Sequence, residues 1–189
     1  MSLSVFLPCR KGSQRVPKKN IKSFAGYKNG LVELKLKQLN SVNEIDFIIL
    51  STDDEQIIKF ANSLNYSKIK VHKRESSLAS NQASTDNLVS HALSLIPKGD
   101  ILWTHVTSPL INTKLYENII NKYFSVLDQD YDSLMTVTTI QSFLWNYKGP
   151  INYSRKIEKW PRTQTLKPIF EINSGIFLAN TETYKKAND

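Results

Sequence analysis

The stretch that decides the fold is PCRKGSQRVPKKN, residues 8–20, together with the short run SVFL at residues 4–7 before it. The run predicts a buried strand. The loop after it holds Gly12, Ser13 and five cationic side chains, namely Arg10, Lys11, Arg15, Lys18 and Lys19. Backbone N–H groups in tight turns bind anions, and nearby cations strengthen that binding. Because open α/β sheets bind ligands at the ends of such strands, we expect a polyphosphate-binding loop; a solvated basic loop is the alternative. The pattern matches neither a Walker P-loop nor the dinucleotide fingerprint.

Length and composition favour one globular domain over residues 1–189. The chain is 40% hydrophobic and 22% charged, which is ordinary for a soluble protein that buries a sizeable core. Cys9 is the single cysteine, so no internal disulfide can form and a reducing compartment fits best. The residues before Pro8 lack the pattern of a signal peptide, and no apolar run approaches the ~18–20 residues of a membrane span. We therefore expect a cytoplasmic protein with no membrane partner.

The formal net charge of +8 raises the question of nucleic acid. The cations are spread along the chain, and their one dense cluster is the first loop. That cluster lacks the interleaved aromatic residues that a single-strand binder uses. The sequence favours a small anionic substrate over nucleic acid, and a solvated lysine-rich surface explains most of the remaining charge.

Strand and helix patterns alternate along most of the chain. Strands are expected at residues 4–7, 47–50, 68–72, 101–106, 133–138 and 174–179, with amphipathic helices between the first five. Thr52 and Glu55 have capping-box spacing before the second helix. The alternation predicts a doubly wound, mostly parallel α/β sheet with helices on both faces. The loops after Leu7, Leu50, His72 and Val106 should then meet at one edge, which makes a nucleotide site there.

The pattern breaks between about Ile140 and Glu171. This stretch has neither helix nor strand period, and it carries six aromatic residues: Phe143, Trp145, Tyr147, Tyr153, Trp160 and Phe170. An exposed apolar patch on this scale usually marks an interface. The alternative is a β-hairpin that folds back on its own domain.

Five short motifs occur in a fixed order along the chain. They are Arg10-x-x-Ser13 with Lys19-Asn20, Ser51-Thr52-Asp53, Arg74 with Leu78-Ala79-Ser80, Thr107-Ser108-Pro109-Leu110, and Arg162-x-Gln164-x-Leu166. Together they resemble the acylneuraminate (CMP-sialic acid) cytidylyltransferases over residues 4 to about 180. The resemblance implies a nucleotide-diphospho-sugar-transferase-like, Rossmann-like sheet. The related CMP-Kdo synthetases share that fold and a similar first loop.

The resemblance implies a definite reaction. The anomeric hydroxyl of a 2-keto acidic sugar, sialic acid or a related nonulosonate, attacks the α-phosphate of CTP and pyrophosphate leaves, normally with Mg²⁺. Arg10 and Asn20 would neutralise and orient the reacting phosphate, and Lys19 would hold the polyphosphate. Ser13 would offer its hydroxyl and backbone donors. The product would serve lipopolysaccharide or capsule synthesis. For Arg10 the alternative is a surface charge, and for Asn20 a turn residue.

The resemblance also assigns the base and sugar sites. Arg74 with the segment Ala83–Thr85 would recognise cytosine, although Ser84 or Thr85 can also cap the next helix. His105 stands where the family usually has a sugar-contacting Gln, and a structural histidine is the alternative. Ile111 replaces a common Arg. The change to His105 leaves the identity of the sugar open.

In the resembled family, the segment that corresponds to residues 140–171 of this chain is a dimerisation arm that reaches the partner's active site. Arg162 and Gln164 would then line the neighbouring substrate pocket, and we expect a homodimer. The family's metal-binding Asp-x-Asp would follow residues 175–179, and no such motif occurs before the end of this sequence. The metal ligands are therefore unassigned, and a truncated chain, an unusual enzyme and an inactive one all stay open. A CMP-Kdo-type synthetase and a non-catalytic nucleotide- or nucleic-acid-binding module are the alternative functions.

Overall fold

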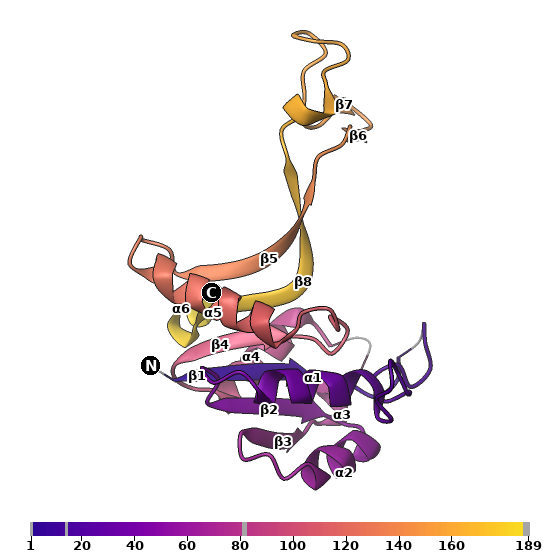
Figure 1. Ribbon diagram of the computed structural model, residues 1–189, viewed down its shortest axis with the longest axis vertical. Coiled ribbons are helices and arrows are strands. Elements are labelled where there is room, and N and C mark those ends of the chain that lie inside the picture. Colours follow the sequence, from indigo (N-terminus) through magenta and orange to yellow (C-terminus); the bar gives the residue numbers. More distant parts are fainter. Residues whose placement is uncertain (1, 14, 81–82, 187–189) are drawn as a thin grey trace. The chain divides into compact units, whose positions relative to one another are not determined.

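A computed structural model describes residues 2–13, 15–80 and 83–186 of the chain (Figure 1). It contains two compact units. The first comprises residues 1–134 and 175–189, and the second comprises residues 135–174. Each unit is described by itself below.

The first unit is built on a mostly parallel sheet. Its strands are β1 (Leu3–Pro8), β2 (Phe47–Thr52), β3 (Ile69–Lys73), β4 (Asp100–Thr104) and the end of β8 (Ile169–Asn180). β1 pairs in parallel with both β2 and β4, β2 pairs in parallel with β3, and β8 runs antiparallel to β4. The strand order is β3-β2-β1-β4-β8-β5, with β5 at Ser133–Ile140. The predicted doubly wound α/β sheet is therefore confirmed.

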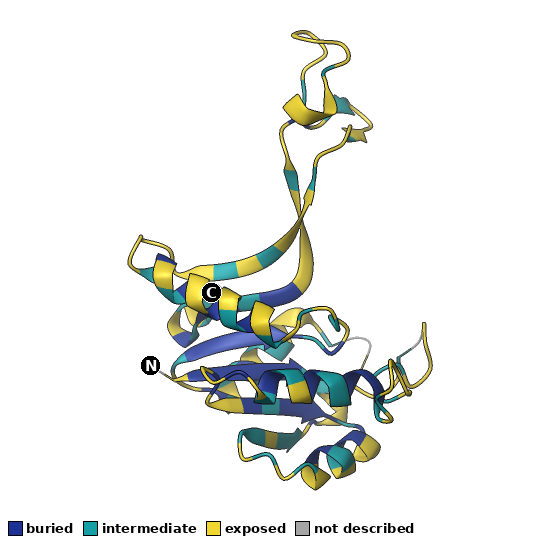
Figure 2. Ribbon diagram, viewed as in Figure 1, coloured by how far each residue is buried: buried dark blue, intermediate teal, exposed yellow. Residues whose placement is uncertain are grey.

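Helices cover both faces of this sheet. They are α1 (Gly30–Asn40), α2 (Glu55–Ser63), α3 (Ser76–Ala79), α4 (Thr85–Leu95), α5 (Thr113–Leu127) and α6 (Thr181–Lys186). Successive side chains of a strand point to opposite faces. Val5 and Leu7 accordingly join the core beneath α1, α2 and α5, while Phe6 packs with residues of α4 and α6. Burial on both faces explains why the central strands have few polar side chains (Figure 2).

Two local predictions need correction. The capping box from Thr52 to Glu55 is wrong, because Thr52 is the last residue of β2 and Asp54 is the N-cap of α2. The Asp54 carboxylate accepts a hydrogen bond from the Gln56 N–H at 2.9 Å, while the Thr52 hydroxyl accepts one from the Asp54 N–H. The predicted loop after His72 also contains the short helix α3.

The second unit holds most of β5, the first half of β8 and a small two-stranded sheet. That sheet pairs β6 (Trp145–Asn146) with β7 (Gly149–Pro150), and a 3₁₀ turn, η1, follows at Thr163–Thr165. β5 and β8 are longer than predicted because their paired backbones continue where the side chains are exposed. An apolar pattern marks only the buried part of a strand.

A buried asparagine and stacked rings organise the second unit. The Asn152 amide donates to the carbonyls of Ser142 and Lys167, and its oxygen accepts from the Leu144 N–H. The Arg155 guanidinium lies over the rings of Trp145 and Trp160, 5.6 and 5.7 Å from their centroids. These contacts order a segment that has no repeating apolar pattern.

Within the described part of the chain, none of the helices combines the length and the apolar character needed to cross a membrane.

Candidate functional site

The loops after the four parallel strands meet, as predicted. The backbone N–H of Lys11, in the loop after β1, donates to a carboxylate oxygen of Asp53 after β2 at 2.6 Å. The Arg10 guanidinium reaches the carbonyl of Ser80, after β3, at 3.5 Å. The segment after β4 joins the same region, because His105 shares a pocket with the first loop. Parallel strands place their carboxyl ends at one edge, and these contacts follow from that topology.

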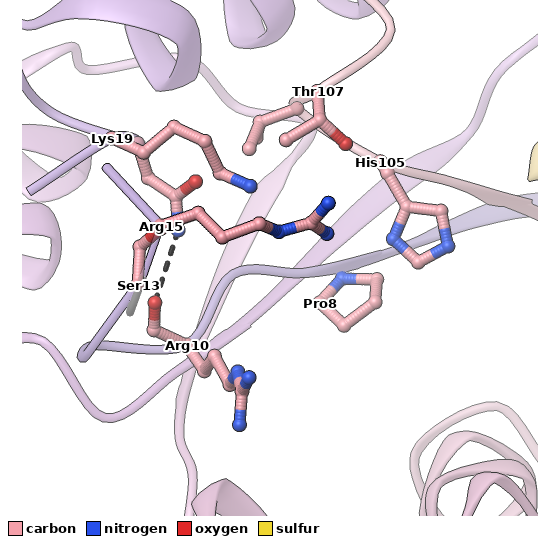
Figure 3. Close-up of a pocket in the computed structure, with 9 residues that line it drawn as sticks. Pro8, Arg10, Ser13, Arg15, Lys19, His105 and Thr107 are labelled. Atoms are coloured by element: carbon pink, nitrogen blue, oxygen red, sulfur yellow. Dashed lines mark hydrogen bonds between the residues drawn. The ribbon is translucent and has the colours of Figure 1, made fainter. Parts of the chain in front are cut away.

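The pocket at this edge has a volume of about 300 Å³, which is at the lower end of ligand-site volumes. Figure 3 shows the basic side chains of the first loop on one side and His105 on the other. Its described lining residues are Pro8, Arg10, Ser13, Arg15, Lys19, Asn20, His105, Val106 and Thr107. Among these described residues are three basic side chains and no carboxylate. Such a pocket suits an anion that carries several oxygen atoms.

The first loop is shaped by one glycine and one asparagine. Gly12 has φ +82°, a backbone conformation that side chains other than glycine's disfavour. The Asn20 side-chain amide donates to the Arg10 carbonyl at 3.0 Å, and the Asn20 carbonyl accepts from the Val32 N–H. Asn20 therefore joins the two ends of the loop and ties them to α1. Its amide orients Arg10 in addition to lining the pocket.

The cations of the loop divide between the two larger cavities beside it. Arg10, Arg15 and Lys19 line the pocket described above. Lys11 and Lys18 line a neighbouring cavity of about 440 Å³, whose lining also includes Asp54 and Glu55. Those carboxylates offset the lysines, so the 300 Å³ pocket is the more strongly positive of the two.

His105 is held at the pocket by the strand that precedes it. The Trp103 indole N–H donates to His105 Nε2 at 3.2 Å, and Trp103 is buried with Phe6 in the core. Burial lowers the pKa of His105, and the positive charge of Lys19 lowers it further. Both effects favour the neutral imidazole.

Arg74 lies in a buried network beside the pocket. Its guanidinium donates to the Ser51 hydroxyl at 3.0 Å and to the Ser51 carbonyl at 2.6 Å. The Ser51 hydroxyl lies 3.0 Å from His91 Nε2 and can donate to it, because it already accepts from Arg74. Burial lowers the pKa of both Arg74 and His91. The arginine predicted to contact cytosine thus also fixes the end of β2.

Ala83 and Thr85 of the predicted base site are not among the described lining residues of the 300 Å³ pocket. Ala83 precedes α4 and Thr85 is its first residue, while the Ser84 hydroxyl caps the helix by accepting from the Asn87 N–H at 3.1 Å. Arg162 and Gln164 belong to the second unit, at and inside η1. Their relation to the pocket remains a prediction.

The sequence analysis did not identify Lys35 as a buried, hydrogen-bonded residue near the strand ends. This residue of α1 is fully buried, and its ammonium group donates to the carbonyls of Ser108 and Ile111, both at 2.9 Å. It also lies 4.9 Å from the centroid of the Tyr116 ring. Burial lowers the pKa of Lys35 to about 7. The signal was available: Lys35 falls among the apolar positions of α1.

The described residues form no group of three or more His, Cys, Asp or Glu side chains that could hold a metal ion. A protein cage for a cation is therefore not evident in the described ranges, and no metal ligand is assigned.

A doubly wound sheet with a basic pocket at the carboxyl ends of its strands is the architecture of a nucleotide-binding α/β protein. The chain belongs to the cytidylyltransferase family, whose model matches residues 4–169.

Curated relatives agree with this assignment. The pseudaminic acid cytidylyltransferase of Campylobacter jejuni is 30% identical over 122 residues, which cover 62% of this chain and 51% of the relative. The N-acylneuraminate cytidylyltransferase A of Danio rerio is 26% identical over 144 residues, covering 76% of this chain and 32% of that protein. The chain thus spans about half the length of the Campylobacter relative that it matches.

Solved structures share the fold. A CMP:2-keto-3-deoxy-manno-octonic acid synthetase complexed with CTP has a TM-score of 0.69 at 14% identity, covering 99% of this chain and 77% of its own. The 4-diphosphocytidyl-2C-methyl-D-erythritol synthase of Anaerococcus prevotii has a TM-score of 0.63 at 18% identity, covering 98% and 74%. At these identities the likeness establishes the fold alone.

Proposed function

We propose that this protein is a nucleotidyltransferase that couples CTP to a 2-keto acidic sugar, giving a CMP-sugar and pyrophosphate. The observation that carries the proposal is the 300 Å³ pocket, where Arg10, Arg15 and Lys19 face His105. Membership of the cytidylyltransferase family supports the nucleotide, and the names of the curated relatives support a nonulosonate as the sugar.

The lining residues fit the negative charge that this reaction handles. Nucleotidyl transfer depends mainly on positioning and on stabilising charge at the phosphate. Asn20 holds the backbone carbonyl of Arg10 just after β1. In this proposal the Arg10 guanidinium would stabilise the reacting phosphate. Lys19 would hold the remaining phosphates, and Ser13 would add a hydroxyl donor.

Mg²⁺ is part of this proposal, with no ligand assigned to it. Proteins usually bind Mg²⁺ through one or two carboxylates together with substrate phosphates, so a dedicated cage is not required. The ion would neutralise phosphate charge when bound. The check is CTP affinity measured by calorimetry with Mg²⁺ and with EDTA, where a tighter complex in Mg²⁺ is expected.

The deciding experiment compares nucleotides and then sugars. Calorimetry with CTP, UTP, ATP and GTP should show preferred binding of CTP. Pyrophosphate release should then be assayed with N-acetylneuraminate, pseudaminic acid and Kdo, and one of the two nonulosonates is expected to react. Equal or absent binding of all four nucleotides would contradict the proposal.

The same assay separates the alternatives. Turnover with Kdo alone would identify a CMP-Kdo-type synthetase. CTP binding without pyrophosphate release would indicate a non-catalytic nucleotide-binding module. Salt-sensitive binding of oligonucleotides would favour a nucleic-acid partner instead.

We also propose that the second unit mediates a homodimer and that the protein works in the cytoplasm. Large apolar side chains are exposed on this unit, including Tyr147, Ile157 and Trp160. Exposed apolar surface on this scale favours an interface. In the dimer, Arg162 and Gln164 would serve the neighbouring substrate pocket, so Arg162→Ala should lower turnover. A variant with full activity would contradict that role.

A further inference from the structure

The strand β4 places a hydrogen-bond donor directly against His105. Trp103 and His105 are two residues apart, so their side chains lie on the same side of the extended chain. The Trp103 Nε1 and His105 Nε2 atoms are 3.2 Å apart. An indole N–H can only donate, so His105 Nε2 must accept and cannot carry a proton.

This contact determines the protonation state of the imidazole. A neutral imidazole with an unprotonated Nε2 carries its proton on Nδ1. Protonation to imidazolium would place a second N–H against the indole N–H and lose the hydrogen bond. Trp103 cannot easily move away, because it is 6% exposed and its ring centroid lies 4.7 Å from that of Phe6.

The charged groups around the pocket act in the same direction. Arg10, Arg15 and Lys19 of the first loop line the pocket together with His105, and its described lining includes no acidic side chain. A further positive charge on the ring would therefore be repelled. Figure 3 shows one ring nitrogen of His105 turned toward these basic side chains and the other turned away. Since Nε2 is engaged by Trp103, Nδ1 is the nitrogen available to a ligand.

We propose that Trp103 holds His105 as the neutral Nδ1–H tautomer, which makes His105 an uncharged hydrogen-bond donor for an oxygen atom of the bound substrate. Trp103 is then a positioning residue and His105 a specificity-determining one. This inference rests on the proposed function and deepens it. The basic side chains of the pocket would attract the phosphates of CTP, and the neutral His105 N–H would donate to a carboxylate or hydroxyl oxygen of the acidic sugar. That N–H disfavours a ligand that presents its own donor at that point.

The test is ¹⁵N NMR of histidine-labelled protein. The chain has only three histidines, and the His105 signals are assigned from their loss in His105→Gln. We expect a protonated Nδ1 and an unprotonated Nε2 from pH 6.5 to 8. Trp103→Phe keeps an aromatic ring on Phe6 but lacks the donor, so the tautomer preference should weaken and the His105 titration should move to higher pH. An imidazolium or an Nε2–H tautomer at pH 7.5 in the unmodified protein would overturn the proposal.

The matched control is Trp145→Phe. The Trp145 indole donates to the Tyr153 hydroxyl at 3.0 Å in the second unit, so this variant also loses one indole donor. It should leave the His105 resonances unchanged. Unchanged His105 resonances in a folded Trp103→Phe protein would contradict the proposal. If that variant does not fold, the pH titration of His105 in the unmodified protein tests the tautomer instead.

Kinetics test the substrate assignment separately. Trp103→Phe should raise KM for the reactive sugar acid several-fold while the Kd for CTP stays within about twofold, because only the donor is misplaced. Equal weakening of both substrates would overturn the assignment to the sugar. If no sugar acid is turned over, the proposed function is wrong. The proposed His105 tautomer would still stand or fall by the NMR result.

Discussion

At the scale of single residues, the site depends on where each cation is held. Arg10 and Lys11 are neighbours in sequence; Arg10 lines the 300 Å³ pocket and Lys11 the 440 Å³ cavity, while both line a third, small cavity of about 10 Å³. Adjacent basic residues can therefore have different roles, and a count of positive charges does not distinguish them.

Arg10→Ala should lower kcat by about a hundredfold or more while it weakens CTP binding only modestly. Its charge is expected to matter most where negative charge develops in the transition state. Steady-state kinetics together with CTP calorimetry provide the measurement. Lys11→Ala is the matched control and should retain most of the turnover. An Arg10→Ala protein with normal kcat and a raised KM would contradict this role.

Lys35 should make stability depend on pH. Burial lowers its pKa to about 7, so between pH 7 and about 10.4 the unfolded chain binds more protons at this site than the folded chain does. The contribution of Lys35 to stability is therefore lowest below pH 7 and rises with pH through that window. Lys35→Met lacks this dependence.

Urea unfolding at pH 6.5 and pH 9 measures the effect. The free energy of unfolding of the original protein minus that of Lys35→Met should be larger at pH 9, by at most about 2 to 3 kcal/mol. The difference cancels the other titrating groups, such as Cys9, whose pKa burial raises to about 12. Lys37→Met, on the exposed side of α1, is the control. Parallel pH curves for Lys35→Met and the original protein would show that the buried amine keeps its ordinary pKa.

At the scale of elements, helix starts at the ligand edge are set by short side chains. Asp54 caps α2, Ser84 caps α4 and Asn112 caps α5, each by accepting from a backbone N–H of its first turn. These caps satisfy N–H groups that have no partner within the helix. They also hold the loops between strand and helix in a defined position.

Asp54→Ala should therefore destabilise the fold by about 1 kcal/mol through the loss of the α2 cap. Glu55→Ala should cost much less, because the ion pair between Glu55 and Lys73 is exposed to solvent. Urea midpoints of the two variants give the comparison. If Thr52 and Glu55 formed a capping box, Glu55→Ala would lose more stability than Asp54→Ala. That result would contradict the assignment of Asp54 as the N-cap.

At the scale of the whole molecule, the chain divides into a unit built on the mostly parallel sheet and a unit with exposed apolar side chains. Ile157 is 90% exposed and Trp160 is 71% exposed. A homodimer would bury such side chains, so Ile157→Ser with Trp160→Ser should lower the mass seen by light scattering from dimer to monomer at micromolar concentration. The substitution Lys156→Ser, on the same segment, should leave the mass unchanged. A monomeric unmodified protein would contradict the dimer.

The sequence by itself determined the sheet and the position of its ligand edge. Apolar runs at regular intervals predicted each strand of the first unit, because strands buried on both faces must be apolar. The loop after β1 was then assigned to the ligand edge from its glycine and its cations. Arg10, Ser13, Lys19, Asn20 and His105 lie together in the structure, since parallel strands share one carboxyl edge.

Only the tertiary structure decided which polar groups meet. Trp103 against His105, Lys35 against the carbonyls after β4, and Arg74 against Ser51 join residues that no local pattern pairs. Two of these contacts span more than twenty positions in the chain, and all three depend on side-chain direction. Periodicity reports which face of an element is buried. It cannot report which donor is buried against which acceptor, because that depends on how the elements pack.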